Sequence, residues 1–374
     1  MTKPVEMAQL WRGDFLECSH LGHAVVVDAA GGVVKAWGDP SLVILPRSSS
    51  KMIQALPLVE SGAADEARLG TEQLALACAS HNGAAIHVER VRTWLAGLGL
   101  SDDDLRCGGH IPRDEEQMKC IVCGTGHPDQ VHNNCSGKHA GFLTLTKHLG
   151  AGPEYIEPDH PVQKAVKDAF EDVTGEATPG FAIDGCSAPN FATSLHGMAR
   201  AMAWFATVGE ESARGRAARR LREAMVKHPE LVAGEGRSCT ELMRAMEGRV
   251  ALKTGAEGYF IAILPEQGLG VALKMMDGQT RGAETAIASI LVMPILFLLK
   301  YRLGKAIGSR SLVADSKETL ACLMLSVALL IGLGAFYIWR LWWIDSVAAL
   351  VIAVLIIREG FETLEEAEGC GHDK

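Results

Sequence analysis

The sequence predicts an α+β fold in which an antiparallel sheet is flanked by helices, followed by a transmembrane helical hairpin. Three observations predict it. Two candidate β-hairpins, over residues 23–37 and 259–275, enclose a long region of helical periodicity. Apolar segments over residues 319–339 and 342–357 then follow near the C-terminus, and the first of them is long enough to span a bilayer.

The first hairpin is predicted by two Val-rich runs, residues 23–28 and 33–37, on either side of Gly31-Gly32. The second joins residues 259–264 and 269–275 through a Pro-Glu-Gln-Gly turn. Residues 107–135 are rich in Gly, Pro and His and are expected to form loops. Helical patterns are expected at about 71–78, 86–99, 142–149, 161–173 and 195–227.

Composition limits the classes of function. The chain has 374 residues and a net charge of −9 without a dominant basic patch, so nucleic acid is not an expected partner. Ten Cys are scattered through a sequence whose first residues lack the pattern of a secretory signal peptide. Reduced thiols in a cytoplasmic catalytic domain are therefore expected.

The stretch Arg47-Ser48-Ser49-Ser50-Lys51 follows an apolar run and opens a helical segment. Ser48 and Lys51 form an S-x-x-K pair one helical turn apart, in which an amine can take the proton of a hydroxyl. The alternative for this short pattern is structural: Ser48 caps the helix and Lys51 is a solvated charge.

Two further motifs follow S-x-x-K in order. Ser80-His81-Asn82 has the form S-x-N, and Lys253-Thr254-Gly255 is a K-T-G that precedes the second hairpin. The same three parts occur in class A β-lactamases and penicillin-binding proteins, whose antiparallel sheet is flanked by helices. A serine-β-lactamase-like fold is expected, and a penicillin-binding-protein-like or β-lactamase-like acyl hydrolase is one candidate function.

A second group of residues has metal-binding chemistry. Cys135, two residues before Gly137, and Cys186, directly after Gly185, lie in expected loops. Two such thiols can hold a soft metal such as zinc, with a third ligand from Lys138, His139 or elsewhere. Two buried free thiols are the alternative. Cys120-x-x-Cys123 is interpreted as a loop feature or an incidental redox pair.

Longer stretches resemble the rhizobial-type (class 3) L-asparaginases over residues 8 to about 285. They are Arg47-Ser48-Ser49-x-Lys51, Cys78-Ala79-Ser80-His81, Arg106-Cys107-Gly108-Gly109-His110, Asn134-Cys135-Ser136-Gly137-Lys138-His139, Asp184-Gly185-Cys186 and the segment 228–237. The resemblance implies hydrolysis of L-asparagine to L-aspartate and ammonia, and a homodimer.

The resemblance also implies residue roles. Two Ser-Lys pairs are implied, Ser48 with Lys51 and Ser80 with Lys253. The implied zinc ligands are Cys135, Lys138 and Cys186, and the residues implied to line the substrate pocket are Arg47, His139, Asp184 and Cys239.

The C-terminal part, residues 286–374, has a different character from the asparaginase-like part, residues 1–285. Residues 292–368 resemble the last part of a cation diffusion facilitator, with Asp315 at an intramembrane metal position and Ser311 at the position of its usual partner. Basic residues between 300 and 310 place the loop before the hairpin on the cytoplasmic side of the inner membrane. The alternatives are a pair of buried core helices, or an inactive fusion.

Overall fold

The computed structural model describes residues 2–124 and 126–291. The chain divides into two compact units, Met1–Ile287 and Ala288–Lys374. The predicted transmembrane helices at 319–339 and 342–357, and Asp315, lie outside the described residues. Within the described ranges, no helix combines the length and apolar character that crossing a membrane requires.

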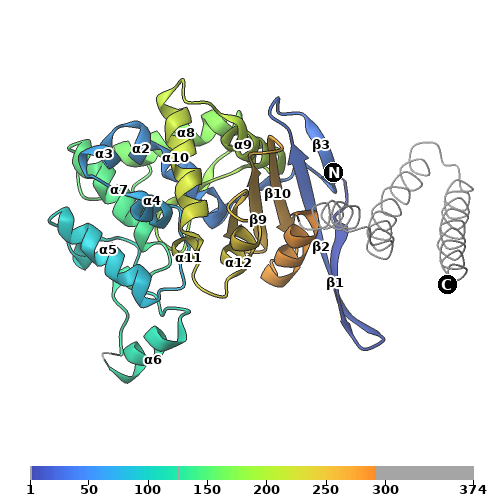
Figure 1. Ribbon diagram of the computed structural model, residues 1–374, viewed down its shortest axis with the longest axis horizontal. Helices are drawn as coiled ribbons and strands as arrows, with labels where there is room; N and C mark the ends of the chain where they lie inside the picture. Colours follow the sequence, from blue (N-terminus) through green and yellow to red (C-terminus); the bar gives the residue numbers. More distant parts are fainter. Residues whose placement is uncertain (1, 125, 292–374) are drawn as a thin grey trace, which may run out of the picture. The chain divides into compact units, whose positions relative to one another are not determined.

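One antiparallel sheet forms the larger β-structure, as predicted (Figure 1). Its strands run in the order β1-β2-β10-β9-β8, and β3 pairs with the second half of β2. The bounds are β1 Val5–Arg12, β2 Phe15–Val27, β3 Val33–Trp37, β8 Ala251–Gly255, β9 Tyr259–Leu264 and β10 Leu269–Met275.

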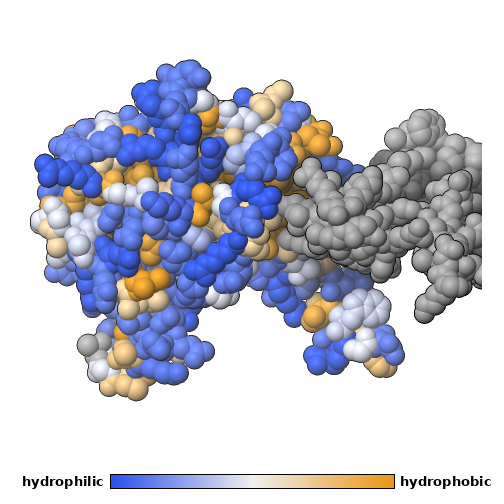
Figure 2. All heavy atoms as spheres, in the orientation of Figure 1, coloured by the Kyte–Doolittle hydropathy of each residue, from blue (hydrophilic) through white to orange (hydrophobic). Residues whose placement is uncertain are grey.

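Both predicted hairpins are confirmed as β2–β3 and β9–β10. The N-terminal hairpin β1–β2, which turns at Gly13 with φ +58°, was not predicted from the sequence. Its tip exposes apolar rings, with Phe15 79% and Trp11 54% accessible, and in Figure 2 apolar and polar colours alternate along it. A strand exposed on both faces lacks the strong alternation by which strands are predicted.

Register decides which face of the sheet carries the K-T-G motif. Gly270 lies opposite Ile263, and Ile263 lies opposite Ala251, so these three residues face the same side of the sheet. Lys253 lies two residues after Ala251 on the same strand, so its side chain points to this side as well. A Cβ on Gly270 would lie 2.2 Å from the Ala199 carbonyl oxygen. Helix α9 (Leu195–Thr207) therefore covers this face, and Lys253 points from the sheet toward the helices.

The helices fill most of the chain between β3 and β8 (Figure 1). Their bounds are α1 Lys51–Gln54, α2 Leu56–Glu60, α3 Ala63–Glu66, α4 Thr71–Ala77, α5 Ala85–Gly97, α6 Glu115–Cys123, α7 Ser136–His148, α8 Pro161–Thr174, α10 Ala213–Lys227, α11 Pro229–Val232 and α12 Ser238–Ala245, with 3-10 turns η1 Arg47–Ser50, η2 Asp102–Asp104 and η3 Gln130–His132. Helical backbone also runs over 280–291.

Two helical predictions and one loop prediction need correction. The segment expected over 195–227 is two helices, α9 and α10, because Ser212 caps a new start through a hydrogen bond from the Gly215 N–H. Helix α7 begins at Ser136, six residues before its expected start. The expected loop 107–135 contains α6, whose N-cap is Asp114.

Two short antiparallel pairs hold the loops around the helices. β4 (Val43–Ile44) pairs with β7 (Thr193–Ser194), and β5 (Phe181–Ile183) pairs with β6 (Pro189–Phe191). The turn between β5 and β6 is closed by the Ser187 N–H, which donates to the Asp184 carbonyl. This turn carries both Asp184 and Cys186.

Candidate active site

The turn η1 that carries Ser48 starts from an unusual backbone conformation. Arg47 has φ +52°, a left-handed conformation that costs free energy for a residue with a Cβ. The side chain of Asn190, from β6, holds it there: the Arg47 N–H donates to Asn190 Oδ1 at 3.1 Å, and Asn190 Nδ2 donates to the Arg47 carbonyl at 3.3 Å. Because Asn190 is itself buried, its two hydrogen bonds fix the direction of the backbone at Ser48, the residue after Arg47.

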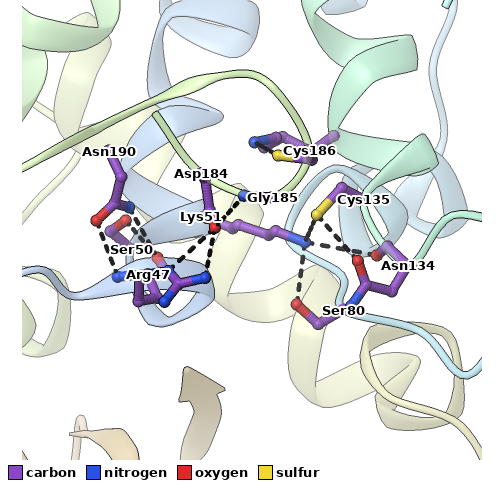
Figure 3. Close-up of polar contacts among 11 residues, drawn as sticks. Arg47, Ser50, Lys51, Ser80, Asn134, Cys135, Asp184, Gly185, Cys186 and Asn190 are labelled. Atoms are coloured by element: carbon purple, nitrogen blue, oxygen red, sulfur yellow. Dashed lines mark hydrogen bonds and ion pairs between the residues drawn. The ribbon is translucent and has the colours of Figure 1, made fainter. Parts of the chain in front are cut away.

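Lys51 joins the first two motifs. Its side chain is 1% exposed, and Nζ donates to Ser80 Oγ at 3.0 Å (Figure 3). The same nitrogen contacts the carbonyl oxygens of Ala79 and Asn134 and lies 3.1 Å from Cys135 Sγ. The Ala79 carbonyl lies just after the C-terminal end of α4, where a cation is favoured.

The hydrogen bond between Lys51 and Ser80 joins one member of each predicted Ser-Lys pair, Lys51 from the first and Ser80 from the second. Lys51 was expected to serve Ser48, but among the described residues the hydroxyl of Ser48 has no hydrogen-bond partner. Its neighbours do: Ser49 Oγ donates to the Pro46 carbonyl and Ser50 Oγ to that of Arg47. Within η1, the Ser48 hydroxyl alone therefore stays available to a substrate.

Lys253 is fully buried on β8, and its Nζ donates to the Thr254 carbonyl at 2.9 Å. No hydrogen bond joins it to Ser80 within the described part of the chain. Burial, and next the charge of Lys51, lower the pKa of Lys253 to about 7. The two amines thus share one site, and burial makes the neutral form of Lys253 available near pH 7.

Cys135, Lys138 and Cys186 come together, although α7 and the β5–β6 turn are far apart in sequence. Lys138 Nζ donates to Cys186 Sγ at 3.1 Å. The pKa of Cys186 is lowered well below its ordinary value, most by a hydrogen bond from Cys135 and then by Lys138, against the effect of burial. The pKa of Cys135 is raised by the same hydrogen bond and by burial. The two shifts have opposite directions, so Cys186 loses its proton before Cys135 does.

His139 follows Lys138 on α7 and is completely buried. Its Nδ1 lies 2.9 Å from the hydroxyl oxygen of Tyr155, while Nε2 has no hydrogen-bond partner. Burial lowers the pKa of His139 to about 4, although Cys186 opposes this shift. The imidazole is therefore neutral at pH 7, with one buried nitrogen still to be satisfied.

The remaining expected pocket residues lie at two places. Arg47 donates from both Nε and Nη2 to Asp184 Oδ1, at 3.0 and 2.8 Å (Figure 3). Both side chains stay partly exposed, 28% and 13%. Cys239, on α12, is buried, and its Sγ accepts the Thr254 N–H at 3.2 Å. Cys239 therefore contacts the K-T-G strand and is not part of the Arg47–Asp184 pair.

Three residues of this region were missed. Asn190 clamps Arg47, Asn134 contacts both Lys51 and the Cys135 thiol, and Tyr155 bridges His139 and the backbone N–H of Arg106 at 2.7 Å. The position of Asn134 next to Cys135 was an available signal. Nothing in the sequence around Asn190 or Tyr155 indicates their long-range contacts.

The donor set at Cys135, Lys138 and Cys186 fits zinc chemically. Two thiol groups and one amine are soft or borderline ligands, and His139, next to Lys138 on α7, has an unpartnered Nε2. Among residues 2–124 and 126–291, no group of three or more His, Cys, Asp or Glu side chains is arranged for a metal ion. A zinc ion here would therefore depend on the amine of Lys138.

Fold and site together define the class of protein. It is an α+β protein with an antiparallel sheet, in which a buried lysine hydrogen-bonds a serine between the sheet and the helices. A model described as L-asparaginase II matches residues 8–296, and the chain belongs to this family. A model described as the cation efflux transmembrane domain matches residues 276–367.

No curated protein matches the chain. Among solved structures, Mglu in its native form is 14% identical with a TM-score of 0.42, covering 72% of this chain and 63% of that one. A β-lactamase from Mycobacterium bovis is also 14% identical, with a TM-score of 0.39, covering 72% of this chain and 93% of that one. The chain thus spans less than two thirds of the length of Mglu.

Proposed function

We propose that this protein hydrolyses the side-chain amide of L-asparagine, giving L-aspartate and ammonia. The observation that carries the proposal is the buried hydrogen bond between Lys51 Nζ and Ser80 Oγ, in a chain of the L-asparaginase II family. It puts an amine and a hydroxyl in position to exchange a proton, which is what a serine needs in order to act without histidine.

In the proposed mechanism Ser48 is the nucleophile. Its Oγ attacks the amide carbon, and its proton passes to Lys51, which must be neutral at that moment. Ser80, hydrogen-bonded to Lys51, relays this proton to the amide nitrogen, and ammonia leaves. Water then hydrolyses the ester, and the serine regains its proton. An alternative assignment exchanges the roles of the two serines.

Arg47 and Asp184 suit the two charged groups of an amino acid. The guanidinium can bind an α-carboxylate through two N–H groups, and the carboxylate of Asp184 can accept from an α-ammonium. Both groups are partly exposed and next to Ser48 in sequence or space. Binding of a zwitterion would exchange their mutual ion pair for two pairs with the substrate.

Zinc is proposed as the ion of the Cys135, Lys138 and Cys186 site. When bound, it would supply a positive charge that fixes both thiols as thiolates. Lys138 would have to lose its proton first. Its pKa is raised, because Cys186 and Cys135 outweigh the effect of burial, so zinc affinity is expected to fall with falling pH.

The test is ammonia release from L-asparagine by the full chain, compared with Ser48→Ala. Ser49→Ala is the matched control, because it removes a hydroxyl of the same turn that is committed to the Pro46 carbonyl. Of these two variants, the proposal requires Ser48→Ala to abolish turnover and Ser49→Ala to keep it. Full activity of purified Ser48→Ala would disprove Ser48 as nucleophile.

A β-lactam reporter substrate tests the other acyl-hydrolase function that the three ordered motifs allow. Turnover of the β-lactam without release of ammonia from asparagine would favour that function. The absence of both reactions would favour an inactive fusion. In that case, circular dichroism must show that the purified chain is folded.

The C-terminal part is proposed to anchor a cytoplasmic catalytic domain to the inner membrane through residues 319–339 and 342–357, and the catalytic domain to form a homodimer. Centrifugation of a cell lysate checks the anchor: full-length protein should sediment with the membranes. Its recovery in the high-speed supernatant would refute this part of the proposal. Light scattering of the detergent-solubilised protein checks the dimer.

A further inference from the structure

A second group of reactive side chains lies away from the candidate active site, where the helical backbone of 280–291 meets strand β2. The Sγ of Cys18 lies 3.5 Å from His20 Nε2, and His20 Nδ1 lies 2.5 Å from Asp277 Oδ2. Arg281 contacts both His20 and Cys18: its Nε is 3.1 Å from His20 Nε2, and its Nη2 is 3.2 Å from Cys18 Sγ.

The partners of His20 define its tautomer. A guanidinium can only donate hydrogen bonds, so Nε2 must be the nitrogen that accepts from Arg281. Asp277 is an acceptor when ionised, so Nδ1 must carry the proton. Burial tends to raise the pKa of Asp277, but the Gln279 N–H and His20 outweigh it and lower the pKa. The lone pair on Nε2 therefore faces both the Arg281 Nε–H and the more distant Cys18 thiol, which share it as an acceptor.

This is the arrangement of a nucleophile, a base and an orienting carboxylate. When the Arg281 Nε–H releases Nε2, a thiol proton can pass to this nitrogen. The resulting imidazolium is paired with Asp277, and the thiolate keeps its hydrogen bond from Arg281 Nη2. Neither Asp277 nor Arg281 belongs to the candidate active site. His20 is 4% exposed, whereas Cys18 is half-buried and so reachable from solvent.

The geometry points to Cys18 as a peroxide-reactive thiol, a modification site formed by His20, Asp277 and Arg281. His20 takes the thiol proton, and the sulfur attacks one peroxide oxygen. The S–O bond forms while the O–O bond breaks, and the hydroxide that leaves receives the proton from His20. Sulfur is oxidised by two electrons to a sulfenic acid, and hydrogen peroxide is reduced to water.

The other described cysteines provide an internal comparison. Cys120 and Cys123 on α6 are more exposed than Cys18, but no described side chain hydrogen-bonds their sulfur atoms. If access alone decided the rate, these two would react first. If the partners decide it, Cys18 reacts first.

The experiment exposes the full chain at pH 7 to a limiting concentration of hydrogen peroxide, traps sulfenic acid with dimedone, and follows each cysteine by peptide mass spectrometry. Cys18 is expected to be labelled about tenfold faster than Cys120. Asp277→Asn keeps a hydrogen-bond acceptor but removes the charge, and is expected to bring the rate for Cys18 down to that for Cys120. Arg281→Met is expected to slow it in the same way.

Arg12→Met is the matched control. Arg12 is a cation on the hairpin that also carries Cys18, but it is paired with Glu17 and does not contact Cys18. It is expected to leave the labelling rate of Cys18 unchanged. Circular dichroism checks that each variant is folded. Equal rates for Cys18 and Cys120 in the unmodified chain, or an unchanged rate in folded Asp277→Asn, would overturn the inference and leave the group as a tie between helix and sheet.

Discussion

Lys51 Nζ and Ser80 Oγ are hydrogen-bonded at 3.0 Å, although the two residues belong to motifs that the sequence assigns to different Ser-Lys pairs. Lys51 is the donor to four groups, of which two are backbone carbonyls. An ammonium group has three N–H bonds, so these contacts compete for them. The hydroxyl of Ser80 therefore responds to any change in the charge of Lys51.

The first prediction concerns this pair. Lys51→Met and Ser80→Ala should each reduce kcat by about 10³-fold or more, because each removes a step of the same proton transfer. The double variant should lose little beyond either single variant. Ammonia-release kinetics measure all three, and effects that multiply in the double variant would mean that the two residues act independently.

The second prediction concerns the stability cost of Lys253. The folded chain releases its proton near pH 7, whereas the ordinary pKa of a lysine is 10.5. Between these values the unfolded chain binds a proton that the folded chain does not, so the free energy of unfolding should rise with pH from about 7 to 10.5. Below pH 7 both states are protonated and this dependence ends.

Lys253→Met should therefore stabilise the protein by about 2–4 kcal/mol at pH 7 while abolishing activity. Urea unfolding at pH 7 and pH 9 measures the gain, which should be smaller at pH 9. Lys147→Met, at an exposed lysine on α7, is the control for loss of a positive charge. A loss of stability in Lys253→Met would show that packing of the lysine stem outweighs burial of its charge.

The third prediction separates binding from chemistry. Asp184→Asn should raise KM for asparagine by about tenfold with a smaller change in kcat, because it removes the charge proposed to bind the α-ammonium group. Asp172→Asn, at a carboxylate paired with Arg214 on the surface, is the charge-matched control. A fall in kcat at constant KM would place Asp184 in the chemical step instead.

The fourth prediction concerns metal. Purified protein should contain about one zinc per chain, and dialysis against a chelator should lower both the melting temperature and the activity. Release of zinc should become easier as the pH falls, because protons compete for Lys138 and the two thiols. Cys186→Ser should lose the metal, while Cys239→Ser should retain it. Elemental analysis of both variants decides whether this assignment of ligands holds.

The fifth prediction concerns the support of the site. A Cβ on Gly137 would lie 2.4 Å from the carbonyl oxygen of Leu76, so α7 and α4 must separate to accept it. Gly137→Ala should cost about 1–3 kcal/mol of stability and displace Lys138 from Cys186. Gly97→Ala, at the end of α5 and without near neighbours, should cost less. Thermal unfolding compares the two variants.

The sequence by itself determined much of the local structure. Periodicity located α4, α5 and α8, and turn residues located the hairpins β2–β3 and β9–β10, because these elements follow from residue preferences over short windows. It also selected Ser48, Lys51, Ser80 and Lys253 by their ordered motifs. It missed β1, whose two faces are both partly exposed.

Only the tertiary structure decided which partners meet. Lys51 contacts Ser80 because the segment that follows α4 passes beside the start of α1, and Asp184 reaches Arg47 because the β5–β6 turn lies beside η1. Such contacts join residues more than 25 positions apart. The shifted pKa of Lys253 likewise depends on burial under helices distant in sequence. Neither spacing nor composition encodes these distances, since they result from how helices pack against the sheet.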